Sequence, residues 1–300
     1  MDSKMKNNLQ TLAYTSDNPR LDYRVVFRKI RQGNLSYFLG RFRLFRLLYS
    51  RYKSFEQLLW KTEPLQKFKS QIINRSSFSV QEIVEFVDQN SYYDQIELTE
   101  SSVNSIFEAA KERKLTSSQG NSSFTYDEYL KLEGEHRLAM AKVINPLEID
   151  EIYRLRYDEF LLDVSEKYLG YYPEKCDVNL WWSFADNLSA EDRRNQFQTI
   201  DYHYDIHGFN FFYVSFYLTD TDNRSGAHVL VKGSHKNKKI SMLFRSARVP
   251  ETMIQENYSE KDIIEIQGKA GTCFLEDAAC FHKALVPIER DRLFLQLRYF

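Results

Sequence analysis

The stretch from Asp201 to His235 constrains the fold of this 300-residue chain more than any other segment. Its middle part, from Phe211 to Leu218, is rich in aromatic and β-branched side chains, which is typical of a β-strand. Polar residues 219–226 follow and indicate a turn, and the apolar segment from Ala227 to Val231 comes next. The stretch therefore predicts two strands joined by a turn.

An H-x-D triplet, His203-Tyr204-Asp205, stands near the beginning of this stretch. Side chains alternate along an extended backbone, so the imidazole and the carboxylate would lie on one side and reach one ion. A second histidine, His282, follows 77 positions after Asp205. Two histidines and one carboxylate can hold Fe(II) on one face and leave positions open for a chelating co-substrate and O₂. We therefore predict a metal site made of these three residues.

The last residues of the chain, from Arg292 to Phe300, alternate like a strand. Arg292 begins this strand and lies 10 positions after His282, where a guanidinium could grip the far carboxylate of the co-substrate in a bidentate pair. Arg290 is the competitor. It lies in the polar turn of residues 289–291, where an exposed ion pair is the ordinary outcome.

Several features together resemble the phytanoyl-CoA dioxygenase family of Fe(II)- and 2-oxoglutarate-dependent oxygenases, over about residues 150 to 300. They are the H-x-D triplet, the Y-L-T-D segment at 217–220, the Gly-Ser-His turn at 233–235, the distal histidine and the closing R-L-x-L-Q strand at 292–296. The resemblance implies a double-stranded β-helix core, the jelly roll of cupin type. It also implies His203, Asp205 and His282 as iron ligands and Arg292 as the anchor of 2-oxoglutarate. One departure is visible, because Asp277-Ala278 stands where the family usually has Asp-Thr.

The strand predicted at 213–218 offers further candidates for cofactor binding. Alternation places Tyr213, Ser215 and Tyr217 on one face, where their hydroxyl groups could line the pocket and donate to 2-oxoglutarate. Beyond the turn at 233–235, a basic run extends from Lys232 to Arg248 and could form a collar for an anionic substrate. A solvated loop is the alternative interpretation of this basic run.

The other histidines are expected to be structural. His207 would share the face of the triplet, but Gly208 beside it indicates that the strand has turned away. His228 and His235 flank glycine turns, where histidine often caps backbone groups, and His136 is expected on the surface.

The front half of the chain predicts helices. Residues 79–82 have the form of a capping box that opens a short helix, a second helix is expected near 102–114, and a third between 149 and 164. The segment 114–123 is loop-like and would be a flexible connection or lid. The fold class that we predict is mainly β with flanking helices and a helical N-terminal part.

That N-terminal part contains a basic amphipathic pattern. Between residues 35 and 53, apolar side chains recur at helical spacing with arginines among them. Such a helix could make a peripheral contact with an anionic membrane, but we expect it to bury its apolar face in the fold and keep its arginines in water. We predict two regions, with residues 1–75 as a flexible tail and basic helical extension and residues 76–300 as the oxygenase domain.

Composition excludes some classes of function. With 41 basic and 42 acidic side chains, nothing indicates a nucleic-acid-binding protein. The three cysteines have no metal-type spacing, and no leader or uninterrupted apolar span opens the chain. We therefore expect a cytoplasmic protein without an integral membrane segment.

The sequence thus favours a dioxygenase that uses Fe(II), 2-oxoglutarate and O₂ to hydroxylate a small organic substrate, with release of succinate and CO₂. Two alternatives stay open. A cupin-type metal-binding isomerase, lyase or ligand sensor would not need Arg292. A catalytically silent scaffold would be expected to lose a ligand, and none of the three is missing.

Overall fold

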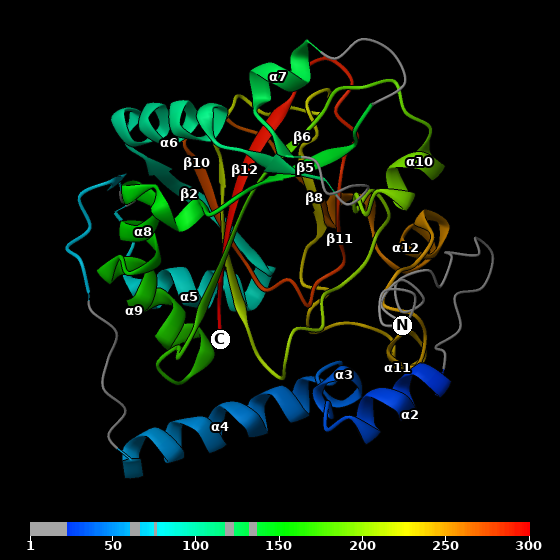
Figure 1. Ribbon diagram of the computed structural model, residues 1–300. Coiled ribbons are helices and arrows are strands. Elements are labelled where there is room, and N and C mark those ends of the chain that lie inside the picture. The colour runs from blue at the N-terminus through cyan, green and yellow to red at the C-terminus, as the bar shows by residue number, and fades with distance from the viewer. Residues whose placement is uncertain (1–22, 61–66, 75–76, 118–122, 132–136) are drawn as a thin grey trace.

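Two antiparallel sheets form the core of the molecule in a computed structural model that describes residues 23–60, 67–74, 77–117, 123–131 and 137–300 (Figure 1). Within these ranges, the larger sheet has nine strands in the order β1-β2-β10-β7-β12-β6-β5-β3-β4, and the smaller has three in the order β11-β8-β9. The larger sheet consists of β1 (Ile73–Asn74), β2 (Tyr92–Leu98), β3 (Leu115–Thr116), β4 (Ser123–Phe124), β5 (Met140–Val143), β6 (Cys176–Ser183), β7 (Phe212–Tyr217), β10 (Thr272–Glu276) and β12 (Arg292–Tyr299). The smaller consists of β8 (His228–Val231), β9 (Ile263–Ile266) and β11 (His282–Ala284).

The strands predicted from the Asp201–His235 stretch and from the end of the chain are confirmed as β7, β8 and β12. β7 and β12 are neighbours at the centre of the larger sheet, and every residue of β7 is buried. The two sheets face each other across an apolar layer that contains Tyr217 of β7, Leu230 of β8 and Phe294 of β12. The segments that lie far apart in the sequence therefore meet in one core.

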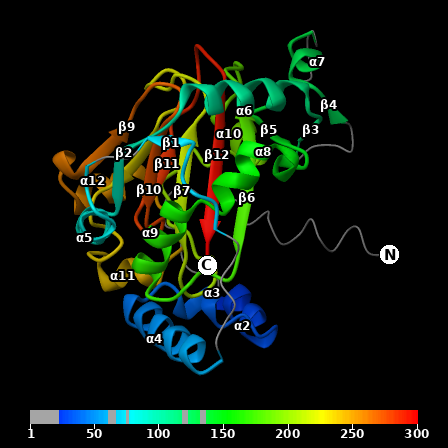
Figure 2. The same ribbon diagram turned by 90° about the vertical axis from the view of Figure 1, so that its left-hand side faces the viewer.

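Helices cover the outer face of the larger sheet (Figures 1 and 2). The helices between the N-terminal part and β7 are α5 (Val80–Asn90), α6 (Glu100–Glu112), α7 (Tyr126–Leu130), α8 (Asp150–Arg156), α9 (Glu159–Leu169) and α10 (Ala190–Asn195), with a short 3₁₀ helix at Pro146–Glu148. Beyond β8 lie α11 (Ile240–Leu243), α12 (Glu251–Asn257) and the 3₁₀ helix Glu260–Asp262. Apolar residues of α5, α6, α8 and α9 join those of β6, β7, β10 and β12 in the largest core cluster.

The predicted helices are confirmed in two cases and corrected in one. The capping box is present, with the Ser79 hydroxyl accepting from the Glu82 amide at the start of α5, and the second helix is α6. The single helix expected between 149 and 164 is wrong, because the chain breaks at Tyr157 and the Asp158 carboxylate caps the new helix α9. In the predicted loop at 114–123, Leu115 and Thr116 pair with β4 as strand β3, while 118–122 lie outside the described residues.

The N-terminal helices form a separate layer at one end of the molecule (Figures 1 and 2). They are α2 (Tyr23–Arg31), α3 (Ser36–Leu39) and α4 (Arg43–Trp60). The expected orientation of the basic helix is wrong, since Arg46 and Lys53 are the buried residues of α4. Acidic partners explain this reversal, because Arg46 pairs with the buried Asp277 and Lys53 pairs with the partly exposed Glu56 and Glu174. Residues 1–22, where the flexible tail was expected, and the predicted boundary at residues 75–76 lie outside the described residues.

Among the described residues, none of the helices combines the length and the apolar character that crossing a bilayer requires.

Candidate metal centre and co-substrate pocket

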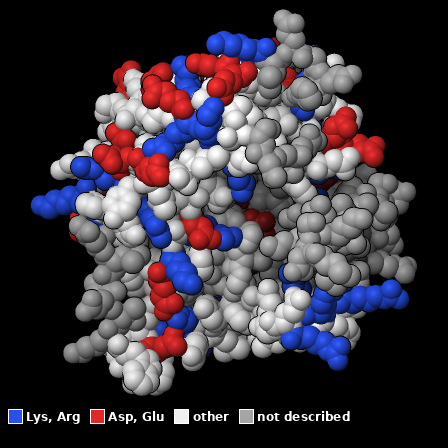
Figure 3. Space-filling model, viewed as in Figure 1, with Lys and Arg blue, Asp and Glu red and all other residues white. Residues whose placement is uncertain are grey.

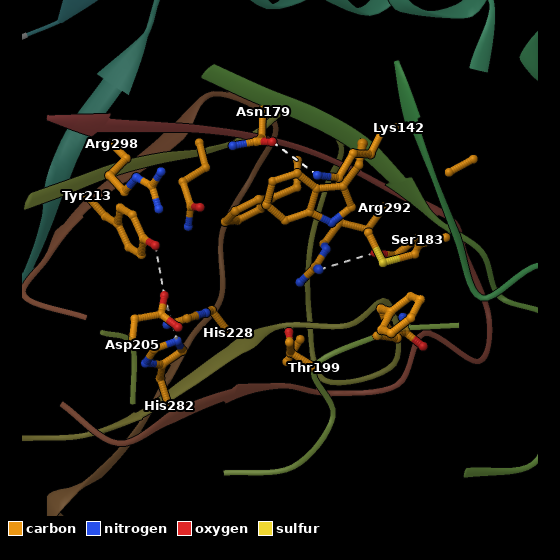
Figure 4. A pocket seen from close by; sticks show the side chains of 18 of the residues that line it. Lys142, Asn179, Ser183, Thr199, Asp205, Tyr213, His228, His282, Arg292 and Arg298 are labelled. Carbon is orange, nitrogen blue, oxygen red and sulfur yellow. Dashed lines mark hydrogen bonds and ion pairs between the residues drawn. The ribbon is translucent and has the colours of Figure 1, made fainter. Parts of the chain in front are cut away.

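A cavity of about 920 Å³ opens between the two sheets (Figure 4). One wall follows the register of β12 and β6, in which Arg292 lies opposite Ser183, Phe294 opposite Trp181, and Gln296 opposite Asn179. Paired residues of antiparallel strands project to the same face, so these rows line the cavity together. β5 extends the wall with Met140 and Lys142, which pair with Ser183 and Trp181. The wall therefore combines apolar rings with a few polar groups.

The opposite side of the cavity carries the predicted metal ligands. One ligand atom from each of His203, Asp205 and His282 lies within 4.8 Å of the other two. The Nε2 atom of His203 is 3.8 Å from Asp205 Oδ1, and that of His282 is 4.0 Å from Asp205 Oδ2. The structure thus brings together the three residues that the sequence selected, although His282 lies 77 positions after Asp205.

Backbone pairing holds the two histidines opposite each other. The His203 amide donates to the His282 carbonyl at 2.9 Å, and the His282 amide donates back at 2.7 Å. Residues 204–207 form no strand, so the extended H-x-D geometry that we expected holds only in part. Asp205 is instead positioned by its amide, which donates to the Ala278 carbonyl at 2.8 Å.

The imidazole tautomers suit a metal. His203 Nδ1 lies 2.9 Å from the Asp201 carbonyl, and His282 Nδ1 lies 3.1 Å from the Cys280 carbonyl. A carbonyl can only accept, so each Nδ1 carries the proton and each Nε2 has its lone pair directed at the shared centre. Burial and the neighbouring His282 lower the pKa of His203 to about 4, which keeps that ring neutral at physiological pH. This donor set fits a divalent transition metal.

The carboxylate of Asp205 is kept ionised. Burial alone would raise its pKa, but the neighbouring imidazoles of His207, His282 and His203 outweigh burial and lower it. The Tyr213 hydroxyl donates to Asp205 Oδ2 at 2.8 Å. In the described part of the chain, the ionic partners of Asp205 are histidines, with no lysine or arginine among them.

Arg292 lies in the same cavity, where its guanidinium is directed inward (Figure 4). The residue is 3% exposed, and burial lowers its pKa. It donates to the Gly226 carbonyl and, at 3.4 Å, to the Ser183 hydroxyl, and its Nε has no acceptor within the described chain. None of the described carboxylates pairs with it. Arg290 differs, because it is half exposed and pairs with Asp222.

Of the three hydroxyl residues predicted on β7, only Tyr213 lines the cavity. Ser215 shares its face but is fully buried beneath, opposite Gln296. The Tyr217 hydroxyl is already used, since it donates to the Ile266 carbonyl and accepts from the His228 amide, both at 2.8 Å. Tyr213 therefore contacts the metal-site carboxylate, whereas the Tyr217 hydroxyl bonds to the backbone of the smaller sheet.

Among the remaining histidines, the prediction for His207 was wrong. His207 has not turned away, because its Nε2 is 3.6 Å from Asp205 Oδ2 and it lines the cavity. It nevertheless falls outside the group of mutually close ligand atoms. His235 contacts Ser91 and the Asp88 carbonyl as a structural residue. His136 lies outside the described residues.

A second acidic group behind His282 was missed from the sequence. Glu276 of β10 is fully buried, with Oε2 3.1 Å from His228 Nε2 and Oε1 3.7 Å from His282 Nδ1. Cys280 donates its thiol to the same carboxylate at 3.3 Å. Glu276, Cys280 and His282 could also hold an ion, but Glu276 and Cys280 do not line the cavity. The sequence did contain a signal for Glu276. Strand alternation places its carboxylate on the same inward face as the apolar Phe274.

The basic run from Lys232 to Arg248 does not surround the cavity, since none of its residues lines it. Lys236 pairs with Asp88 instead. Lys238 is partly buried, donates to the Ser234 carbonyl at 3.0 Å and lies over the rings of Tyr204 and Phe281. The expected collar is therefore not formed by these lysines.

Residues 175–285 match the family model described as phytanoyl-CoA dioxygenase. This segment resembles the phytanoyl-CoA dioxygenase family. The match includes the three candidate metal ligands and ends before Arg292. Among curated protein sequences, none matches the chain.

Solved structures show a similarity at the level of the fold. SnoN, described as a non-heme alpha ketoglutarate dependent epimerase from nogalamycin biosynthesis, gives a TM-score of 0.50 at 15% identity and covers 74% of this chain and 80% of its own. EctD from S. alaskensis, solved with bound Fe, gives a TM-score of 0.49 at 16% identity. The match covers 75% of this chain and 78% of the EctD chain. The likeness to SnoN shows a shared fold, and the predicted double-stranded β-helix core is confirmed.

Proposed function

We propose that the chain is an Fe(II)- and 2-oxoglutarate-dependent dioxygenase that hydroxylates a small organic substrate and releases succinate and CO₂. His203, Asp205 and His282 would hold the metal through two Nε2 atoms and one carboxylate oxygen. Two imidazoles and a carboxylate on one face are the ligand set of non-haem Fe(II) oxygenases, which leaves the cavity side open. Bound iron would supply the activation of O₂.

The observation that supports this proposal most is the uncompensated charge of Arg292. A guanidinium stays protonated even when it is buried, and a buried charge is costly unless it is paired. Arg292 donates only to a carbonyl and a hydroxyl in the described chain, although it lies in the cavity of the three metal ligands. The C5 carboxylate of 2-oxoglutarate would complete its hydrogen bonds and fix the direction in which the co-substrate points to the metal.

The cavity has room for a second molecule. A volume of about 920 Å³ lies near the upper end of ligand pockets, which span roughly 300–1,000 Å³. Its basic residues besides Arg292 are Lys142, Lys283 and Arg298. Arg298 pairs with Asp177 and Lys283 with Glu251, whereas Lys142 contacts the Asn179 amide oxygen. Lys142 is therefore the cavity lysine that is best placed to pair with an anionic group of the substrate, because its partner is not a carboxylate.

The test combines iron content with succinate formation in the full chain. Protein loaded with Fe(II) should convert 2-oxoglutarate to succinate in the presence of O₂, even slowly without substrate. His203→Ala should lose both the iron and the succinate. His207→Ala is the matched control, because His207 also lies beside Asp205 but outside the ligand group, and it should keep most of the iron.

Two results would count against the proposal. Full iron occupancy and full turnover in His203→Ala would show that the ligand set is wrong. Tight iron binding without any 2-oxoglutarate turnover in the unaltered chain would favour the cupin-type isomerase, lyase or sensor.

A further inference from the structure

The outward face of α4 is mainly apolar, although the exposed Arg51 lies within it. Six large side chains recur at helical spacing on this face, and Leu58 alone is 77% exposed. They are Leu44, Leu47, Leu48, Phe55, Leu58 and Leu59. From the first to the last, the face extends about 22 Å along the helix axis. Monomeric proteins in water rarely expose an apolar surface of this length, so the face indicates an interaction site.

Charged contacts on the inward side fix the helix in this orientation. Arg46 pairs with Asp277 at 2.8 Å, and Lys53 pairs with Glu174 at 2.6 Å. Just before the helix, Arg41 donates to the Tyr204 hydroxyl at 2.8 Å. Rolling the helix to bury its leucines would break these pairs and leave Asp277 buried without its cation. The apolar face is therefore held outward by the domain itself.

The surroundings of this face are strongly basic. Residues 23–60 contain nine lysines and arginines and one acidic residue, Glu56, whereas the whole chain has a net charge of -1. Arg28 and Arg31 of α2 and Arg51 of α4 are exposed. Figure 3 shows basic side chains gathered at the lower right, where Figure 1 places α2. Tyr23 and Phe27 of α2 are exposed as well.

We propose that α2 and α4 bind the surface of an anionic lipid bilayer. The leucine face of α4 would enter the boundary between headgroups and acyl chains, with Arg28, Arg31 and Arg51 at the phosphate level. Aromatic residues such as Tyr23 suit the same depth. A second copy of the chain fits less well, because a two-fold interface places the same patch on both subunits and would bring the exposed arginines of α2 and α4 close to those of the other copy.

Vesicle sedimentation tests this proposal with the full chain. Phosphatidylcholine vesicles that contain phosphatidylserine should sediment the protein, and phosphatidylcholine alone should do so much less. Phe55→Glu with Leu58→Glu should lower the partition coefficient at least tenfold. Leu130→Glu is the matched control, since Leu130 is exposed on α7 at the far end of the molecule, and it should bind like the unaltered chain.

The charge contribution is tested separately. Each basic residue near an anionic surface contributes a factor of about five, so changing Arg28, Arg31 and Arg51 to Gln should weaken binding about a hundredfold. High salt should weaken binding of the unaltered chain in the same direction.

Three results would overturn the proposal. One is the absence of sedimentation with phosphatidylserine vesicles. Another is binding that Phe55→Glu with Leu58→Glu leaves unchanged, which would exclude insertion of the leucine face. The last is a dimer in analytical ultracentrifugation that these substitutions dissociate, which would make a second copy the occupant.

Discussion

Arg46 and Arg292 are both buried arginines at the edge of the same core, but their surroundings differ in one respect. Arg46 donates to both oxygens of Asp277, at 2.9 and 2.8 Å, and also reaches Asn210. Arg292 has only a carbonyl and a hydroxyl, and its Nε has no acceptor in the described chain. A buried charge that is paired belongs to the architecture, whereas one that lacks a counter-ion indicates where a ligand binds.

The two buried aspartates repeat the contrast. The pKa of Asp277 is lowered because the Arg46 guanidinium outweighs the effect of burial. Asp205 has imidazoles and the Tyr213 hydroxyl as partners instead of a lysine or arginine in the described chain. Arg292 thus lacks an anion and Asp205 lacks a cation within one cavity, and 2-oxoglutarate and Fe(II) would supply both.

The largest expected effect is on stability at the paired site. Arg46→Met should lower the free energy of unfolding by about 3–5 kcal/mol, because Asp277 would stay buried without its cation. Arg292→Met should cost much less in protein without ligands, since it removes a charge that has no counter-ion. Urea denaturation of both variants measures the difference. Equal losses would remove the distinction between the two arginines.

The second prediction concerns the hydroxyl that supports Asp205. Tyr213→Phe should weaken Fe(II) binding about 10- to 100-fold, as expected for the loss of a group that orients a metal ligand. Tyr217→Phe lies on the same face of β7 but donates to Ile266, so its iron affinity should not change. Metal titration under anaerobic conditions compares the two variants. If both bind iron like the unaltered chain, Tyr213 does not position Asp205.

Lys238 is a further cation without a carboxylate partner in the described chain; it is partly buried and has carbonyls and rings as partners. Burial lowers its pKa from 10.5 to about 7. Between pH 7 and 10.5 the unfolded chain therefore binds more protons at this site than the folded chain, and the free energy of unfolding rises with pH. The rise should be on the order of 1 kcal/mol per pH unit.

The measurement is urea denaturation across this pH range for the unaltered chain and Lys238→Met. The variant should lack the rise that Lys238 contributes, and the difference between the two curves isolates it from other titrating groups. Parallel curves would mean that Lys238 keeps an ordinary pKa in the folded protein.

The smallest effect is expected at the exposed cation of the cavity. Lys142 is in contact with water, so an ionic contact with the substrate is worth less than about 1 kcal/mol. Lys142→Gln should raise KM a few-fold at low salt, with less difference at high salt. Lys269→Gln is the control, because Lys269 is exposed outside the cavity. An unchanged KM in Lys142→Gln would argue against an anionic substrate.

Most of the candidate site was selected from the sequence. The H-x-D triplet and Arg292 at the head of the last strand have short-range patterns, and the resemblance to one family joined them to the distal His282. Glu276 was missed because its role depends on His228 and His282, which reach it from the opposite sheet.

The orientation of α4 could not be predicted for a related reason. An amphipathic pattern shows that a helix has two faces, but the partner decides which face is buried. The partner of Arg46 is Asp277, 231 positions later in the chain. The buried carboxylate of Asp277 draws the charged face of α4 toward the core, where an apolar face is usual. The sequence of the helix itself contains no sign of this partner.

The most direct test of the central claim is the affinity of 2-oxoglutarate for anaerobic, Fe(II)-loaded protein. The comparison covers the unaltered chain, Arg292→Lys and Arg290→Lys. Lysine keeps the charge but cannot form the bidentate pair. The free energy of 2-oxoglutarate binding should therefore weaken by about 2–5 kcal/mol in Arg292→Lys, which is roughly a thirtyfold to several thousandfold loss of affinity. Arg290→Lys should bind like the unaltered chain, because Arg290 is exposed and paired with Asp222. Equal affinities in all three proteins, or no binding in the unaltered chain, would contradict the account.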